Sequence, residues 1–189
     1  MQLTGEQVLP VPRERVWQAL NDPEVIRACV PGCESIERVT DSEFRAQLAA
    51  TIGPVKAKFA GKLRLEDLSP PESYRLVFEG SGGAAGTAKG GARVSLAAEG
   101  GGTRLAYEAQ ATVGGRLAQV GSRLVDGVAG KLAEEFFQRL RARLEAEAAS
   151  APPPEPPAVA AAVSLAGWGK WLLIAAALAA AAFIVGKIL

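Results

Sequence analysis

The stretch VKAKFAGKLRLE, residues 55–66, alternates apolar or small side chains with charged ones, and Ala60 is the single exception. A period of two is typical of a strand that has one dry face and one wet face. Gly53-Pro54 precedes the stretch and favours a turn. Residues 55–66 therefore predict one strand of an antiparallel sheet.

The same period extends over residues 34–113 and predicts a meander of about six strands. The expected dry faces consist of Phe44, Ala46, Leu48, Ala50 and Ile52, then Tyr74, Leu76 and Phe78, then Ala92, Val94, Leu96 and Ala98, then Leu105, Tyr107, Ala109, Ala111 and Val113. A Gly-Gly-Gly run at residues 100–102 predicts a hairpin turn.

Helical patterns flank this meander. A short strand at residues 2–11 is followed by two expected helices, at residues 13–21 and 22–30. Residues 116–148 form an amphipathic pattern that predicts one long helix. Its apolar stripe consists of Leu117, Val120, Leu124, Val128, Leu132, Phe136, Leu140 and Leu144. The fold class is α+β: a curved antiparallel sheet wrapped around a long C-terminal helix.

Composition restricts the function. The chain has 21 Lys and Arg, 20 Asp and Glu, and no histidine. Two of those cations and one of those anions lie beyond residue 150, so residues 1–150 carry no net charge, which argues against a nucleic-acid partner. Without histidine the commonest general base and metal ligand are missing. The first six residues lack the basic and apolar regions of a signal peptide, so we expect the domain to stay in the cytoplasm.

The C-terminal part differs in character. Five prolines within residues 152–157 predict an extended spacer. Residues 171–186 carry no charge and predict a single membrane span, although a helix that packs on a protein surface is the alternative. Trp168, Lys170, Trp171 and Lys187 are the expected interfacial residues of this anchor. We divide the chain into a domain at 1–148, a linker at 149–166 and an anchor at 167–189.

Small residues recur on the expected dry faces of the sheet and in the first half of the long helix, where Gly121, Gly127 and Gly130 fall within ten residues. They indicate either close helix–sheet packing or an apolar cavity for a ligand. The expected lining of such a cavity is Phe59, Leu63, Phe78, Tyr107, Leu124 and Val128, and Gly121 and Ala109 are the positions where a larger side chain should fill it.

Two other motifs favour no chemistry. Cys29 and Cys33 have a C-x3-C spacing without a second ligand pair, so we interpret them as buried thiols or a reversible disulfide, with no metal site. The glycine-rich residues 80–86 precede an expected strand, whereas a dinucleotide loop precedes a helix, so a hairpin loop is expected.

Several short motifs carry a family resemblance over residues 1–148. They are Pro12-x4-Trp17-x2-Leu20, Asp22-Pro23-Glu24, Val30-Pro31-Gly32-Cys33, Ile52-Gly53-Pro54-Val55, Phe59-x-Gly61, Gly90, Thr103-x-Leu105 and Phe136-Phe137. In order and spacing the set resembles the CoxG family of carbon monoxide dehydrogenase, within the START/Bet v 1-like (SRPBCC) helix-grip superfamily.

The resemblance implies a hydrophobic pocket between sheet and helix, and association with a molybdenum-containing dehydrogenase. It implies no catalytic residue set. We expect a non-enzymatic accessory protein on the cytoplasmic face of the cell inner membrane, with a single-pass C-terminal anchor. The expected ligand is a respiratory quinone (menaquinone or ubiquinone), because a cytoplasmic dehydrogenase must pass electrons to an acceptor in lipid. A polyketide cyclase that uses Tyr74, Tyr107 or Glu108, and a generic lipid-transfer protein, are the alternatives.

Overall fold

A computed structural model describes residues 1–150, which form one compact unit. Seven antiparallel strands make a single sheet in the order β1-β7-β6-β5-β4-β3-β2. The strands are β1 (Gln2–Leu9), β2 (Cys33–Arg38), β3 (Glu43–Ile52), β4 (Val55–Ser69), β5 (Ser73–Ser81), β6 (Thr87–Glu99) and β7 (Gly102–Gly114). The helices are α1 (Arg13–Leu20), α2 (Pro23–Cys29), the 3-10 turn η1 (Gly83–Ala85), α3 (Arg116–Gln119) and α4 (Ser122–Ser150).

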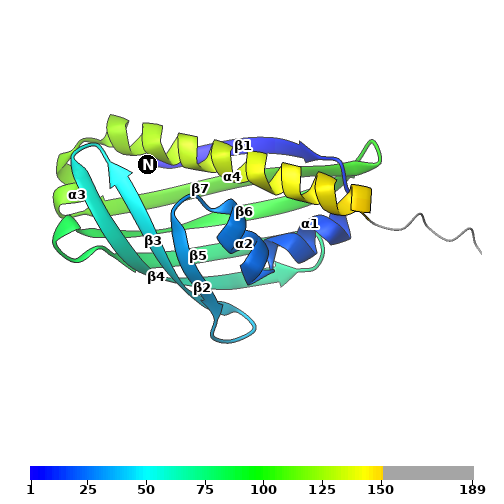
Figure 1. The fold of residues 1–189 in the computed structure, drawn as a ribbon, viewed down its shortest axis with the longest axis horizontal. Coiled ribbons are helices and arrows are strands. Elements are labelled where there is room, and N and C mark those ends of the chain that lie inside the picture. Colours follow the sequence, from blue (N-terminus) through cyan, green and yellow to red (C-terminus); the bar gives the residue numbers. More distant parts are fainter. Residues whose placement is uncertain (151–189) are drawn as a thin grey trace, which may run out of the picture. The chain divides into compact units, whose positions relative to one another are not determined.

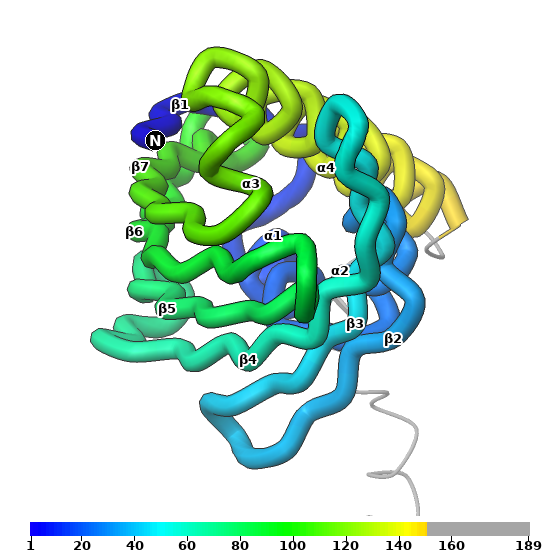
Figure 2. Tube along the Cα trace, turned by 90° about the vertical axis from the view of Figure 1, so that its left-hand side faces the viewer, coloured from blue at the N-terminus to red at the C-terminus, as the bar shows by residue number. Residues whose placement is uncertain are grey.

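The sheet is strongly curved, and all the α-helices lie on its concave side (Figure 1). Viewed end-on, the strands curl from β1 through β4 to β2, and α4 bridges the opening between the two edges (Figure 2). Helix α4 contacts β1 near one edge and β3 near the other. The predicted sheet, wrapped around a long C-terminal helix, is therefore confirmed for the described residues.

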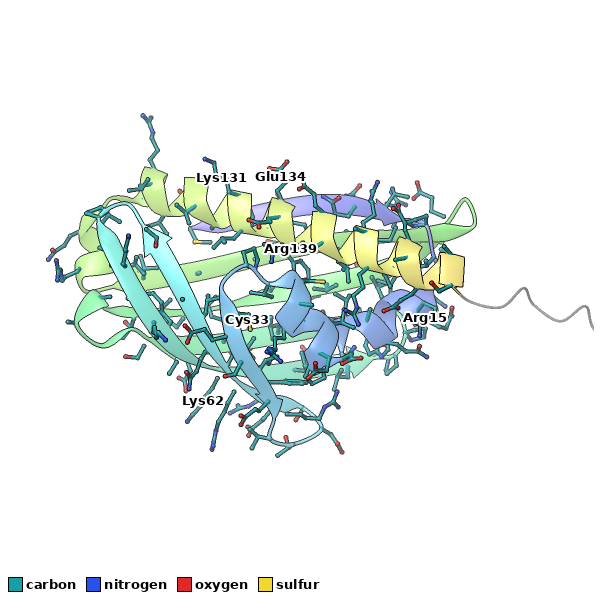
Figure 3. The ribbon with its side chains drawn as sticks, viewed as in Figure 1. Arg15, Cys33, Lys62, Lys131, Glu134 and Arg139 are labelled. Atoms are coloured by element: carbon teal, nitrogen blue, oxygen red, sulfur yellow. The ribbon has the colours of Figure 1, made fainter. Side chains whose placement is uncertain are left out.

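The register follows the alternation from which the sheet was predicted. In β4, Leu63 pairs with Phe44 of β3 and with Phe78 of β5, so three large apolar side chains share one inward row. The charged neighbours Lys62 and Arg64 project to the outer face, where Lys62 points away from the helix (Figure 3). The hairpin predicted at residues 100–102 joins β6 to β7.

Local signals explain the short helices. Asp22 caps α2, where its side-chain oxygen accepts a hydrogen bond of 2.9 Å from the Glu24 backbone N–H. Pro23 follows at the first helical position, where its missing N–H costs nothing. Together these residues fix where α2 begins, close to the inward face of the sheet.

One half of the domain has a solid core. Leu9, Val16, Leu105, Leu140 and Leu144 are almost completely buried where α1 and the C-terminal half of α4 pack on β1 and β7. The buried Thr103 hydroxyl donates a 2.7 Å hydrogen bond to the Val11 carbonyl and joins β7 to the segment before α1. The N-terminal half of α4 covers a cavity instead.

The prediction of one unbroken helix over residues 116–148 is wrong. The chain forms α3, leaves helical geometry at Val120 and Gly121, and re-enters it in α4. Gly121 has φ +91°, a left-handed conformation that is incompatible with a continuous α-helix. The break shifts the phase of the apolar stripe, so Val125 is buried and Leu124 is 41% exposed.

Among residues 1–150 no helix combines the length and the apolar run needed to cross a membrane. The predicted linker and anchor, with Trp168, Lys170, Trp171 and Lys187, lie outside the described residues.

Candidate functional site

The concave side of the sheet encloses a cavity with two adjoining lobes of about 330 and 380 Å³. The aliphatic lobe lies toward the β3–β4 turn, and its lining includes Ala50, Ile52, Phe59, Val113, Leu117, Val125 and Val128. The aromatic lobe lies toward α1 and α2, and its lining includes Phe44, Tyr74, Tyr107, Phe136 and Phe137. Both lobes are lined by Ile26, Val30, Ile36, Leu48, Leu63 and Leu132. Each lobe is large enough for part of a small-molecule ligand.

Six of the eight residues predicted for the site line this cavity. Phe59, Phe78 and Val128 line the aliphatic lobe, Tyr107 and Ala109 line the aromatic lobe, and Leu63 borders both. Their positions follow from the strand period, which places alternate residues of β4, β5 and β7 on the concave face. That they bind a ligand stays a prediction.

Leu124 and Gly121 do not line either lobe, and this placement from sequence needs correction. Both are exposed, because the break before α4 turns them outward. Leu124 lies over the β3–β4 turn, where a Cβ added at Gly53 would be 2.7 Å from its Cδ2. A larger side chain at Gly121 would meet no atom within 4 Å, so it would extend into open space and leave the cavity unfilled.

The open question of packing against cavity is answered differently for different small residues. Gly127 is exposed on α4, and Gly130 is half-buried with no atom within 4 Å of an added Cβ, so neither permits close contact with the sheet. Ala50, Ala109 and Ala111 on the strands do line the cavity. Small side chains on the strands therefore leave the space that α4 covers.

Sequence reasoning missed the contribution of α1 and α2. Leu20, Ile26, Val30 and Pro31 all border the aromatic lobe. Helix α2 has only seven residues, too few for a clear helical period. The signal that could have found it is the cap at Asp22, which sets where α2 begins and therefore which residues face the sheet.

The aromatic lobe contains no ionisable side chain other than tyrosine. Among its lining residues the polar ones are Asn21, Tyr74 and Tyr107. Asn21 is already engaged, because its Nδ2 donates to the Trp17 carbonyl at 2.8 Å. Burial raises the pKa of both tyrosines, so their hydroxyls keep their protons at neutral pH. The lobe thus offers hydrogen-bond donors and no charge.

Both thiols are free. Cys29 is buried, and Cys33 is half-buried and lines the aliphatic lobe. Burial raises the pKa of both thiols; Arg143 and Arg139 oppose the rise at Cys29, and Arg27 opposes it at Cys33. Each thiol therefore stays protonated to a higher pH than an exposed cysteine does, which disfavours nucleophilic chemistry here.

An antiparallel sheet that grips a long helix around an apolar cavity defines a helix-grip protein of the START/Bet v 1-like type. The solved structure of Ara h 8.0201 shares this fold with a TM-score of 0.55 at 15% identity, over 77% of this chain and 98% of that one. More specifically, the chain belongs to the CoxG family of carbon monoxide dehydrogenase, whose model matches residues 5–145.

Other solved structures agree with this assignment. A conserved protein from Geobacillus kaustophilus is 30% identical with a TM-score of 0.73, over 78% of this chain and 97% of that one. A protein described as uncharacterized, from Rhizobium leguminosarum, is 23% identical with a TM-score of 0.59, over 77% of this chain and 95% of that one, and supports the fold alone. A comparison with curated protein sequences finds no match.

Proposed function

We propose that this protein is a membrane-anchored accessory protein of a molybdenum-containing, carbon monoxide dehydrogenase-type dehydrogenase. It recruits the enzyme to the cytoplasmic face of the membrane and holds a hydrophobic ligand, a respiratory quinone, for electron transfer. The single observation that supports this function best is the apolar cavity between the sheet and α4. The family name supplies the enzyme partner.

The chemistry of the cavity favours an uncharged, apolar ligand. No Asp, Glu, Lys or Arg lines the aromatic lobe. In the aliphatic lobe, the lining positions Lys62 and Glu79 alternate with inward residues, and their side chains belong to the outer face. Burying a charged group without a partner is costly, so an ionised ligand is disfavoured. A ring with an isoprenoid tail fits two adjoining lobes.

The anchor has a physical role beyond attachment. A tether keeps the domain close to the bilayer and raises its effective concentration toward a lipid-borne ligand. The proline-rich residues 152–157 would act as a semi-rigid spacer between domain and membrane. Quinone extraction and delivery to the dehydrogenase then become local events.

A cyclase is the second candidate, and the two tyrosines of the aromatic lobe favour it. Glu108 does not support it, because this residue is exposed on the outer face of β7 near Gln2. A raised tyrosine pKa also makes each phenol a weaker source of the phenolate base that a cyclase needs. The accessory function is therefore preferred over catalysis, and generic lipid transfer remains the third candidate.

The first experiment tests the anchor. A chain that ends after Ser150 should move from the membrane fraction to the soluble fraction, because residues 171–186 are removed. Full-length protein should bring the dehydrogenase to membranes, and the shortened chain should not. If both forms fractionate alike, the anchor is refuted.

The second experiment tests the ligand. Full-length protein purified from quinone-containing membranes is extracted with organic solvent and examined by mass spectrometry. We expect quinone with the wild type, much less with Ala109→Trp in the cavity, and an unchanged amount with Ala97→Trp, an exposed position of β6. Absence of quinone from the wild type, together with full electron transfer by Ala109→Trp, would exclude the quinone function.

A further inference from the structure

Tyr74 is a buried polar residue whose ring position is fixed by its neighbours. It is 7% exposed and packs with Phe44 and Leu65. Its ring meets Trp17 edge-on, with centroids 5.6 Å apart and an interplanar angle of 79°. Contacts on this scale hold the hydroxyl at one place in the aromatic lobe.

The Tyr74 hydroxyl has no hydrogen-bond partner among residues 1–150, although it belongs to a buried side chain. In that part of the chain, Arg13 Nε is the side-chain atom that is both sealed from solvent and unpaired. The Tyr74 oxygen is therefore not sealed, and since the residue lines the aromatic lobe, its hydroxyl opens onto the cavity. An unmade hydrogen bond in a buried place costs free energy that a ligand acceptor can recover.

The other tyrosine is oriented differently. Tyr107 and Tyr74 flank Val94 on one inward row of the sheet. The Tyr107 ring stacks on Phe137 at 5.0 Å and leans over β1, where a Cβ added at Gly5 would lie 2.6 Å from its hydroxyl oxygen. Its hydroxyl thus lies toward the edge strand, which leaves Tyr74 as the free donor on the α1 side of the lobe.

The surroundings of Tyr74 also decide the charge of the acceptor. The aromatic lobe has no cationic lining residue. Arg38, whose guanidinium lies 5.1 Å from the Phe44 ring centroid, is not among the lining residues and donates to the Asn21 carbonyl. A carboxylate placed beside Tyr74 would lack a counter-charge, whereas a neutral carbonyl oxygen needs only the phenol donor.

We infer that the Tyr74 hydroxyl donates a hydrogen bond to a neutral carbonyl oxygen on the polar end of an otherwise apolar ligand. The carbonyl end then occupies the aromatic lobe, and the hydrocarbon part extends into the aliphatic lobe. This assignment depends on the proposed function, because it requires the cavity to bind a ligand. It adds a recognition residue and an orientation, and it distinguishes a quinone-type ligand from a fatty acid.

The test uses full-length protein in detergent and two probes that differ only in their carbonyl groups. One is 2-methyl-1,4-naphthoquinone with a short isoprenoid tail, and the other is the naphthalene hydrocarbon with the same tail. Tyr74→Phe should weaken quinone binding about fivefold to tenfold, the loss expected for one neutral hydrogen bond. Binding of the hydrocarbon should change less than about twofold, and Tyr107→Phe, the matched control, should change neither probe by more than about that factor.

A second measurement does not need the variant to fold. The infrared carbonyl bands of the bound quinone in the wild type should include one shifted to lower frequency than in a hydrocarbon solvent. Equal losses for both probes, or carbonyl bands at their hydrocarbon-solvent frequencies, would refute the role of Tyr74. If neither probe binds the wild type, the proposed function itself fails, and the inference fails with it.

Discussion

Individual side chains have separable roles in this molecule, and two leucines of α4 make the contrast plain. Leu140 is completely buried between α4 and the sheet, whereas Leu124 is 41% exposed over a turn. Leu140→Ala should lower the free energy of unfolding by about 2–5 kcal/mol, through lost burial and the cavity left behind. Leu124→Ala should change it by less than about 0.5 kcal/mol. Urea denaturation of both variants checks this, and similar losses would contradict the packing described for α4.

Tyr74 gives stability a dependence on pH. Burial raises its pKa above the ordinary value of 10.0, so on alkaline titration the unfolded chain loses this proton before the folded one. The contribution is fully present below about pH 10 and is lost as the pH rises through the raised pKa. We expect the unfolding free energy of the wild type to fall more steeply above pH 10 than that of Tyr74→Phe, by at most about 1.4 kcal/mol per pH unit. Parallel curves from urea titrations would show that the phenol is not buried.

At the scale of elements, two glycines of similar surroundings should respond in opposite directions. Neither Gly121 nor Gly127 has an atom within 4 Å of an added Cβ, but only Gly121 has a positive φ, of +91°. Gly127→Ala should stabilise the domain by about 0.5–1 kcal/mol, because alanine is the better helix former. Gly121→Ala should destabilise it by about 1 kcal/mol, because alanine avoids the left-handed region. Thermal unfolding of both variants measures the difference, and a stabilising Gly121→Ala would mean that α3 and α4 can join.

The strands were predictable from sequence because their register is set by a period of two with one buried face. A shift by one residue in β4 would bury Lys62 and Arg64, so the pattern admits one solution. The break between α3 and α4 was not predictable in this way. Leu117, Val120 and Leu124 fit a helical stripe, and the conformation of Gly121 depends on how α3 packs against β7 and η1. Tertiary contacts decided that residue, and with it the places of two predicted site residues.

The cavity was predictable in kind and less so in detail. Alternation placed Phe59, Leu63 and Phe78 on the concave face, since strand geometry fixes every second side chain. Small side chains permitted a void without requiring one, so only the placement of α4 shows which of them border space. The lining from α1 and α2 depends on how these short helices pack, and no local pattern records that.

For the whole molecule, the cavity links ligand binding to stability. A ligand that binds only the folded protein raises the free energy of unfolding by about 2.7 kcal/mol when its free concentration is one hundred times Kd. Added quinone should therefore raise the melting temperature of the wild type and of Ala97→Trp, and should leave Ala109→Trp nearly unchanged. Differential scanning fluorimetry in detergent measures the three shifts, and an equal shift for Ala109→Trp would place the ligand outside the cavity.

The sheet order has a consequence for biosynthesis. Strand β1 is made first, yet its partner is β7, so that Gln2 pairs with Gln110 and Leu9 with Thr103. Strand β2, the other edge, pairs with β3 almost at once. As the chain leaves the ribosome, the β2–β7 meander can assemble progressively while β1 waits unpaired for about a hundred residues, and non-local pairing of this kind is slow. During translation the N-terminal strand is thus an open edge, and a nascent-chain chaperone has most to protect before β7 emerges.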